Sequence, residues 1–215
     1  MIEKIYLNSN VNMYSLSRHI LRYCWTNRIL DDKLKGRRRP ITILDLGCGS
    51  GYETELLANI VSSCPLTIIG VDQDKEAIAY AKKYHKKVQC NKNKIVYKCQ
   101  SIKKFLNQLE SVDWIVAFEI LEHLEEMNQV LQLMGENCQG IIGSIPYKEK
   151  KGNKYHRHFN LTEQSLLKPM KDYSILFWKQ DSRAYIPIHT KINYLSKNLL
   201  FLIEKKMKEK NERSY

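Results

Sequence analysis

The stretch FEILEHLEE gathers four carboxylates and one histidine within nine residues. Carboxylates and imidazoles can take a proton from a hydroxyl, and together they can hold a divalent cation. Glu119, Glu122 and His123 are spaced i, i+3 and i+4, so a helix through them would present all three on one face. Glu125 and Glu126 fall off that face, and we interpret them as solvated acids at the start of a helix.

Two more histidines follow in the segment SIPYKEKKGNKYHRHFNLTE, residues 144–163. They alternate among aromatic residues, and either can act as a general base on a hydroxyl or complete a cation site. The alternative without chemistry is that Glu119 caps backbone amides and His123 packs structurally. The catalytic candidates are His123, His156, His158 and Glu119. The candidate ligands for Mg²⁺ or Mn²⁺ are Glu119, Glu122, His123 and His158.

The elements that must position these residues alternate regularly along the chain. Short apolar runs are typical of buried strands, and they are separated by stretches with helical spacing of apolar residues. This alternation predicts a doubly wound, mostly parallel, Rossmann-like α/β sheet. The expected strands are 41–47, 66–72, 94–100, 112–119 and 140–146, and the expected helices are 12–35, 52–63, 75–87, 102–110 and 121–136.

The last part of the chain departs from this alternation. After a helix at 161–170, residues 172–180 and 198–206 form two expected strands with no helix between them. They would bring the sheet to seven strands and close it with an antiparallel hairpin at one edge. The expected divisions are an N-terminal helical cap (1–40), the main domain (41–206) and a charged tail (207–215).

Composition and charge restrict the class of protein. Of 215 residues, 43% are hydrophobic, which argues for a folded domain rather than disorder. The net charge of +12, from 35 Lys+Arg against 23 Asp+Glu, suits an anionic partner. A chain rich in Lys, Asn, Ile and Tyr also follows from an AT-rich genome, so the charge is weak support for any partner.

Cysteine usage and hydropathy indicate the compartment. The six cysteines form no CxxC pair, and most lie in apolar runs, so we expect reduced, buried thiols. No run approaches the roughly 20 apolar residues needed to span a bilayer, and MIEKIYLNSN lacks the apolar stretch of a signal peptide. We therefore expect a soluble, cytoplasmic protein with no transmembrane segment.

The end of the first expected strand carries the sequence DLGCGSGYE. In a doubly wound sheet the ligand lies at the carboxyl ends of the strands, and glycines there let the backbone approach it. The third glycine of a dinucleotide fingerprint would fall at Tyr52, and Asp45 would repel a pyrophosphate. Asp72, which ends the second strand, is placed for a ribose diol. A cationic ligand tolerates Asp45, so the glycine loop, the acid within it and the acid ending the next strand together suit S-adenosylmethionine better than NAD.

D-L-G-C-G-S-G followed by G-V-D resembles the class I S-adenosylmethionine-dependent methyltransferases, over roughly residues 41–205. By that resemblance Asp45, Gly47 and Gly49 would line the methionine end of the cofactor, and Asp72 would hold its ribose hydroxyls. Gln73 would flank the adenine, and Ser101 stands where the family usually carries an aspartate. The implied cofactor-binding set is Asp45, Gly47, Gly49, Gly51, Asp72, Gln73, Ser101 and Phe118.

The acidic triplet resembles two kinds of methyltransferase. E-x-x-E-H is similar to a motif of small-molecule and sugar O-methyltransferases, including those of ubiquinone synthesis. With a downstream histidine, it also resembles the metal site of the small-RNA 3′-terminal 2′-O-methyltransferases. The string I-P-Y-K-E…H…F-N-L-T-E is similar to methyltransferases from cell-surface glycan clusters.

These resemblances imply transfer of a methyl group from S-adenosylmethionine to a hydroxyl of a small polar or sugar-type acceptor. One alternative is a metal-dependent RNA ribose 2′-O-methyltransferase, in which the basic residues 37–39 would contact phosphates. A second alternative is a binding protein without catalysis, which Ser101 motivates. The expected partners are a small-molecule or glycan acceptor, with RNA as the alternative and DNA not expected.

Overall fold

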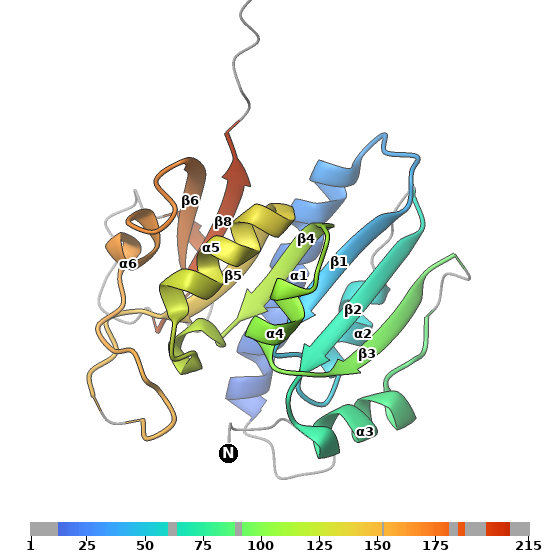
Figure 1. Ribbon diagram of the computed structural model, residues 1–215, viewed down its shortest axis with the longest axis horizontal. Coiled ribbons are helices and arrows are strands. Elements are labelled where there is room, and N and C mark those ends of the chain that lie inside the picture. Colours follow the sequence, from blue (N-terminus) through green and yellow to red (C-terminus); the bar gives the residue numbers. More distant parts are fainter. Residues whose placement is uncertain are drawn as a thin grey trace, which may run out of the picture.

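The computed structural model describes residues 13–59, 64–88, 92–151, 153–180, 185–187 and 197–206. Within these ranges the chain forms one eight-stranded sheet in the order β3-β2-β1-β4-β5-β8-β6-β7, with helices on both faces (Figure 1). The strands are β1 (Ile41–Leu46), β2 (Leu66–Asp72), β3 (Lys94–Cys99), β4 (Val112–Phe118), β5 (Cys138–Pro146), β6 (Tyr173–Gln180), β7 (Tyr185–Pro187) and β8 (Asn198–Lys205). The helices are α1 (Met13–Leu34), α2 (Tyr52–Ala58), α3 (Lys75–Tyr84), α4 (Ile102–Asn107), the 3₁₀ turn η1 (Leu121–His123), α5 (Met127–Asn137) and α6 (Glu163–Leu167).

The strand pairing confirms the predicted fold class. Strands β1 to β5 pair in parallel, and β8 pairs antiparallel with both β5 and β6. The two C-terminal strands therefore form the predicted antiparallel pair, with β8 on the inner side next to β5. The short strand β7 adds three residues at the outer edge and was not predicted.

The strands at the centre of the sheet are buried on both faces. In β1, Ile43 packs with α1 and α2, whereas Leu44 and Leu46 pack with α4 and α5. A strand covered on both faces needs apolar residues at most positions, and this explains why ITILDL is apolar except at Thr42 and Asp45. The carboxyl ends of these strands are thereby held at one edge of a rigid layer.

Helix α1 belongs to the same core as the sheet. Tyr23, Trp25, Leu30 and Leu34 are buried in one cluster with strand residues such as Val116. The N-terminal segment predicted as a cap thus packs directly on the sheet over its described part. No described helix is long and apolar enough to cross a membrane. The predicted tail, 207–215, lies outside the described residues.

The predicted helix at 121–136 begins later than expected. Glu119 has a positive φ of 50°, residues 121–123 form one 3₁₀ turn, and Leu124 is extended. The α-helix starts only at Met127. Burial explains the difference, because Ile120 and Leu121 must both enter the core at the end of β4. The prediction that a helix aligns the acidic triplet on one face is therefore wrong.

The described cysteines carry free thiols. Cys48, Cys64 and Cys138 are buried as expected, whereas Cys24 and Cys99 are exposed. The expectation of buried thiols is wrong for these two, which lie on the outward side of α1 and at the end of the edge strand β3.

Candidate functional site

A cavity of about 1190 Å³ opens at the carboxyl ends of the central strands, where α1, the glycine loop and the segment after β5 meet. A second cavity of about 510 Å³ lies beside it, between α4 and the turn that leads into α5. The two cavities share six lining residues and so form one continuous site: Gly47, Asp72, Gln73, Ile120, His123 and Tyr155. This is the position predicted from the strand alternation.

The glycines of the loop after β1 differ in what surrounds them. All adopt positive φ, with values of 73° at Gly47, 50° at Gly49 and 86° at Gly51. A Cβ at Gly49 would meet no atom within 4 Å, and this residue lines the larger cavity. A Cβ at Gly51 would instead lie 2.6 Å from the Cβ of Ala81. Gly49 therefore leaves room for a ligand, whereas Gly51 permits packing against α3.

The two predicted cofactor acids differ in exposure to the site. Asp72 lines both cavities, and its carboxylate accepts hydrogen bonds from the backbone amides of Gly49 and Asp74 at 3.0 and 2.8 Å. Asp45 is only 1% exposed and lies behind the cavity wall. It accepts hydrogen bonds from Tyr23 Oη and Thr54 Oγ1, and burial raises its pKa to about 7. Asp45 thus supports the glycine loop from within the core, through its bonds to α1 and α2.

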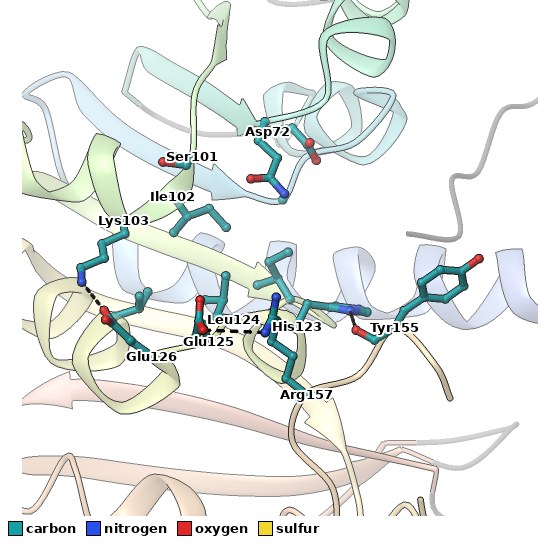
Figure 2. A pocket seen from close by; sticks show the side chains of 14 residues that line it. Asp72, Ser101, Ile102, Lys103, His123, Leu124, Glu125, Glu126, Tyr155 and Arg157 are labelled. Atoms are coloured by element: carbon teal, nitrogen blue, oxygen red, sulfur yellow. Dashed lines mark hydrogen bonds and ion pairs between the residues drawn. The ribbon is translucent and has the colours of Figure 1, made fainter. Parts of the chain in front are cut away.

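The remaining predicted cofactor residues lie around these cavities. Gln73 lines both, Ser101 lines the smaller one at the start of α4, and Phe118 lines the larger one. Figure 2 shows Asp72 and Ser101 on one wall of the smaller cavity, with His123, Tyr155 and Arg157 on the opposite wall. An adenosine group between these walls would meet Asp72 and Ser101 on the same side.

Glu119 is engaged by protein groups. Its Oε1 accepts a hydrogen bond from Ser144 Oγ at 2.6 Å, and its Oε2 accepts one from Asn198 Nδ2 at 2.5 Å. Arg22 Nη1 lies 3.8 Å from Oε1. The carboxylate at the end of β4 is therefore hydrogen-bonded to β5 and β8, and it lies close to a guanidinium of α1.

Glu122 has the opposite environment. It is fully buried, yet neither carboxylate oxygen has a hydrogen-bond partner among the described residues. Burial, followed by the nearby carboxylate of Glu119, raises the pKa of Glu122 well above its ordinary value. A buried carboxyl without a hydrogen-bond partner among the described residues, on a cavity wall, is available to a ligand, a proton or a cation.

Two of the predicted histidines converge on Glu122. His123 Nε2 lies 3.9 Å from Glu122 Oε1, and the rings of His123 and His156 meet edge to face at 4.8 Å between centroids. One ligand atom each from Glu122, His123 and His156 lies within 4.8 Å of the others. Burial lowers the pKa of His123, so its imidazole is neutral at pH 7 and can accept a proton.

His158 lies away from this group. Its Nε2 donates a hydrogen bond to the backbone carbonyl of Leu124 at 2.7 Å. The backbone amides of Arg157 and His158 also donate to the carbonyl of Glu122, at 2.8 and 3.2 Å. These bonds fasten the segment after β5 over the acidic turn, and they place His156 rather than His158 beside Glu122.

Sequence reasoning missed the contribution of α1 to the cavity wall. Arg18, His19 and Arg22 line the larger cavity, and Arg22 is buried with its guanidinium carbon 5.8 Å from the ring centre of Phe118. Burial, and then the charge of Arg22, lower the pKa of His19 to about 3. The signal for this wall was the i, i+4 spacing of Arg18 and Arg22 on a predicted helix.

Comparison with known proteins identifies the family. Residues 38–174 match the family model described as a methyltransferase domain. The chain therefore belongs to this methyltransferase domain family, in class I, and its cofactor is S-adenosylmethionine. The structure fits that cofactor, because Gly49 leaves open space beside the carboxylate of Asp72 in the larger cavity.

Curated relatives match the chain over about half its length. The chain is 34% identical over 111 residues to the ubiquinone biosynthesis O-methyltransferase of Pelagibacter ubique, covering 50% of this chain and 43% of that protein. It is 30% identical over 96 residues to the mitochondrial ubiquinone biosynthesis O-methyltransferase of Saccharomyces cerevisiae, covering 45% of this chain and 29% of that protein. The chain thus spans less than half the length of either relative.

Solved structures share the fold at low identity. The magnesium protoporphyrin IX methyltransferase ChlM of Synechocystis, with bound S-adenosylmethionine, superimposes with a TM-score of 0.61 at 15% identity, over 93% of this chain and 86% of that chain. The small RNA methyltransferase HEN1 superimposes with a TM-score of 0.65 at 22% identity, over 88% of this chain and 25% of that chain. Both support the fold and neither specifies an acceptor.

Proposed function

We propose that this domain transfers the methyl group of S-adenosylmethionine to a hydroxyl of a small polar or sugar-type acceptor. The observation that carries the proposal is the lining of the larger cavity around the acidic turn. That part carries seven side chains that donate or accept hydrogen bonds, beside the apolar Phe118, Ile120 and Pro146, namely Glu122, His123, Glu149, Asn153, His156, Lys197 and Asn198.

Such a lining suits an acceptor that carries several hydroxyls. A long apolar acceptor would leave the buried Glu122 carboxyl without a hydrogen-bond partner, and an unpaired buried polar group costs about 1–3 kcal/mol. A polyol or sugar can pair with these polar side chains and be oriented by them, because such sites reject analogues that lack the matching polar groups. The relatives named as ubiquinone biosynthesis O-methyltransferases support a hydroxyl as the group that is methylated.

The described residues divide between cofactor and acceptor. Asp72 and Gln73 would hold the adenosine part, and Gly49 leaves room for the cofactor. Bound S-adenosylmethionine supplies an electrophilic methyl group. His123 and His156 are placed to take the proton of the acceptor hydroxyl, which contributes typically ~10²–10⁴-fold to the rate. Holding the hydroxyl in line with the methyl group supplies much of the rest.

The test is a comparison of acceptors with a radiolabelled methyl donor. Calorimetry first establishes that the protein binds S-adenosylmethionine. Methyl transfer is then measured with monosaccharides and polyols, with long-alkyl phenols, and with short RNA oligomers. We expect transfer to the polar hydroxyl compounds. Transfer to the long-alkyl phenols alone would contradict the polar acceptor.

A second candidate, a metal-dependent RNA ribose 2′-O-methyltransferase, is favoured by the group of Glu122, His123 and His156. These residues would hold Mg²⁺ or Mn²⁺, which supplies Lewis acidity to a bound hydroxyl. The basic residues 37–39 do not support the phosphate track, because they precede β1 at the amino end of the sheet, opposite the cavity. Transfer to RNA alone in the same assay would establish this candidate.

A further inference from the structure

The segment after β5 returns over the cavity as a closed loop. The amide of Lys148 donates to the carbonyl of Leu161 at 2.9 Å, and the amide of Asn160 donates to the carbonyl of Glu149 at 2.8 Å. These two bonds join the arms of the loop at its base. The loop carries Glu149 on one arm and His156 on the other, and both side chains line the larger cavity.

The partners of His156 define which ring nitrogen carries hydrogen. Nδ1 is hydrogen-bonded to the carboxylate of Glu149, and Nε2 lies 3.0 Å from the amide nitrogen of Asn153. An ionised carboxylate can only accept, so Nδ1 carries the hydrogen in the neutral ring. Nε2 then has a lone pair, which the amide of Asn153 can meet as a donor. The side chain of His156 is only 9% exposed, so these protein groups are its main hydrogen-bond partners.

His123 has the same arrangement with a different partner. Its Nδ1 lies 3.0 Å from the backbone carbonyl of Tyr155, which can only accept, so Nδ1 again carries the hydrogen. Figure 2 shows this bond reaching from the turn to the loop. The Nε2 lone pair of His123 thereby lies beside Glu122, and the Nε2 lone pair of His156 faces the amide of Asn153. The backbone carbonyl of Tyr155 fixes the tautomer of His123, whereas the tautomer of His156 depends on a single side chain, Glu149.

We propose that Glu149 is a positioning residue, which holds His156 as the Nδ1–H tautomer so that Nε2 can receive the proton of the acceptor hydroxyl when that hydroxyl replaces the amide of Asn153 as its donor. This inference rests on the proposed function. In the step itself the acceptor oxygen forms the new C–O bond as the S–C bond breaks, and the electron pair stays on sulfur. The hydroxyl proton moves to Nε2, and the Glu149 carboxylate stabilises the imidazolium that results.

A surface ion pair is the simpler interpretation of Glu149, whose side chain is 34% exposed. Such pairs contribute about 0–1 kcal/mol to stability. The two interpretations differ in one observable. A positioning role predicts that removal of the carboxylate changes the tautomer of His156, whereas an ion pair on the surface predicts that it does not.

The experiment compares Glu149→Ala and Glu149→Gln with the matched control Glu110→Gln, an exposed acid outside both cavities. Long-range ¹H–¹⁵N correlation spectra of ¹⁵N-histidine protein report the tautomer, and the His156→Gln spectrum assigns the signal. We expect Nδ1–H in wild type and control, and loss of that state in Glu149→Ala. A glutamine carbonyl can still accept from Nδ1, so Glu149→Gln should retain the tautomer.

The kinetic readout uses the acceptor identified in the transfer assay. Glu149→Ala should lower kcat by about 10–100-fold, as for residues that orient a metal-ligating histidine, with the KM for S-adenosylmethionine near wild type. Glu149→Gln should recover part of the loss. An unchanged tautomer in Glu149→Ala overturns the inference whatever the activity. A changed tautomer in a protein that transfers methyl to no polar hydroxyl supports the positioning of His156 and overturns the proposed function alone.

Discussion

Asn198, the first residue of β8, donates a hydrogen bond to Glu119 at the end of β4, across 2.5 Å and 79 residues of sequence. Ser144 on β5 satisfies the other carboxylate oxygen. Three neighbouring strands therefore meet at one side chain. Because both oxygens accept hydrogen bonds from protein groups, we expect Glu119 to support the wall of the site, and its role as a base stays a prediction.

We expect Glu119→Ala to destabilise the fold. The substitution leaves Ser144 and Asn198, both buried, without their acceptor, and each orphaned donor costs about 1–3 kcal/mol. Urea denaturation followed by circular dichroism measures the loss. A stable Glu119→Ala protein that binds S-adenosylmethionine normally but lacks activity would instead support the original prediction that Glu119 is catalytic.

Asp72→Ala should weaken binding of S-adenosylmethionine by about 10–100-fold. Loss of a charged acceptor for the ribose hydroxyls corresponds to about 1.5–3 kcal/mol. Calorimetry gives the affinity. Because Asp72 also accepts from the Gly49 amide, thermal unfolding of the same variant shows how much of the effect comes from the loop. Unchanged affinity would remove the ribose assignment.

Gly49→Ala and Gly51→Ala should fail in different ways. The added Cβ at Gly49 projects into open space in the cavity, so the protein should fold and lose affinity for the cofactor. The added Cβ at Gly51 would collide with Ala81 and Tyr97, so that variant should be the less stable one. Both carry the strain of a positive φ, about 1 kcal/mol, so each is the control for the other. Normal cofactor binding by Gly49→Ala would exclude it from the cofactor loop.

Glu122→Gln should stabilise the protein above about pH 5. The folded pKa of Glu122 lies well above the ordinary value of 4.5, so the folded state binds the proton more tightly than the unfolded state. The stability that this group contributes is present below the unfolded pKa and falls as pH rises toward the folded pKa, by up to about 1.4 kcal/mol per pH unit. Melting temperatures of both proteins from pH 4 to 8 test this. Parallel curves would show that the carboxyl is stabilised by a bound partner.

Removal of metal separates the two candidate mechanisms. We expect full activity in EDTA, with His123→Ala and His156→Ala each reducing kcat by roughly 10²–10⁴-fold, as for loss of a general base. His158→Ala should affect stability instead, since its ring holds the carbonyl of Leu124. Activity that disappears in EDTA and returns with Mn²⁺ or Mg²⁺ would establish the cation site at Glu122, His123 and His156.

The fold could be predicted because its signals are local. The apolar run of β1, the glycines after it and the acid that ends β2 can each be recognised within a few residues of sequence, although their contacts reach distant residues such as Ala81. The turn at 119–124 could not be predicted, because its conformation depends on Ile120 entering the core and on a donor at Asn198. Periodicity showed that α1 is a helix, but the direction of Arg22 follows from packing against distant strands.

The bond between Arg22 and Gln180 joins residues 158 positions apart, and together with the bond from Asn198 it has a kinetic consequence. Contacts of large sequence separation require closure of long loops, which slows their formation relative to local contacts. The parallel strands β1 to β5 can pair before β6 and β8 arrive. We therefore expect the part of the cavity wall that contains Arg22 and Asn198 to form late in folding. Recovery of ligand binding would then report the final folding step.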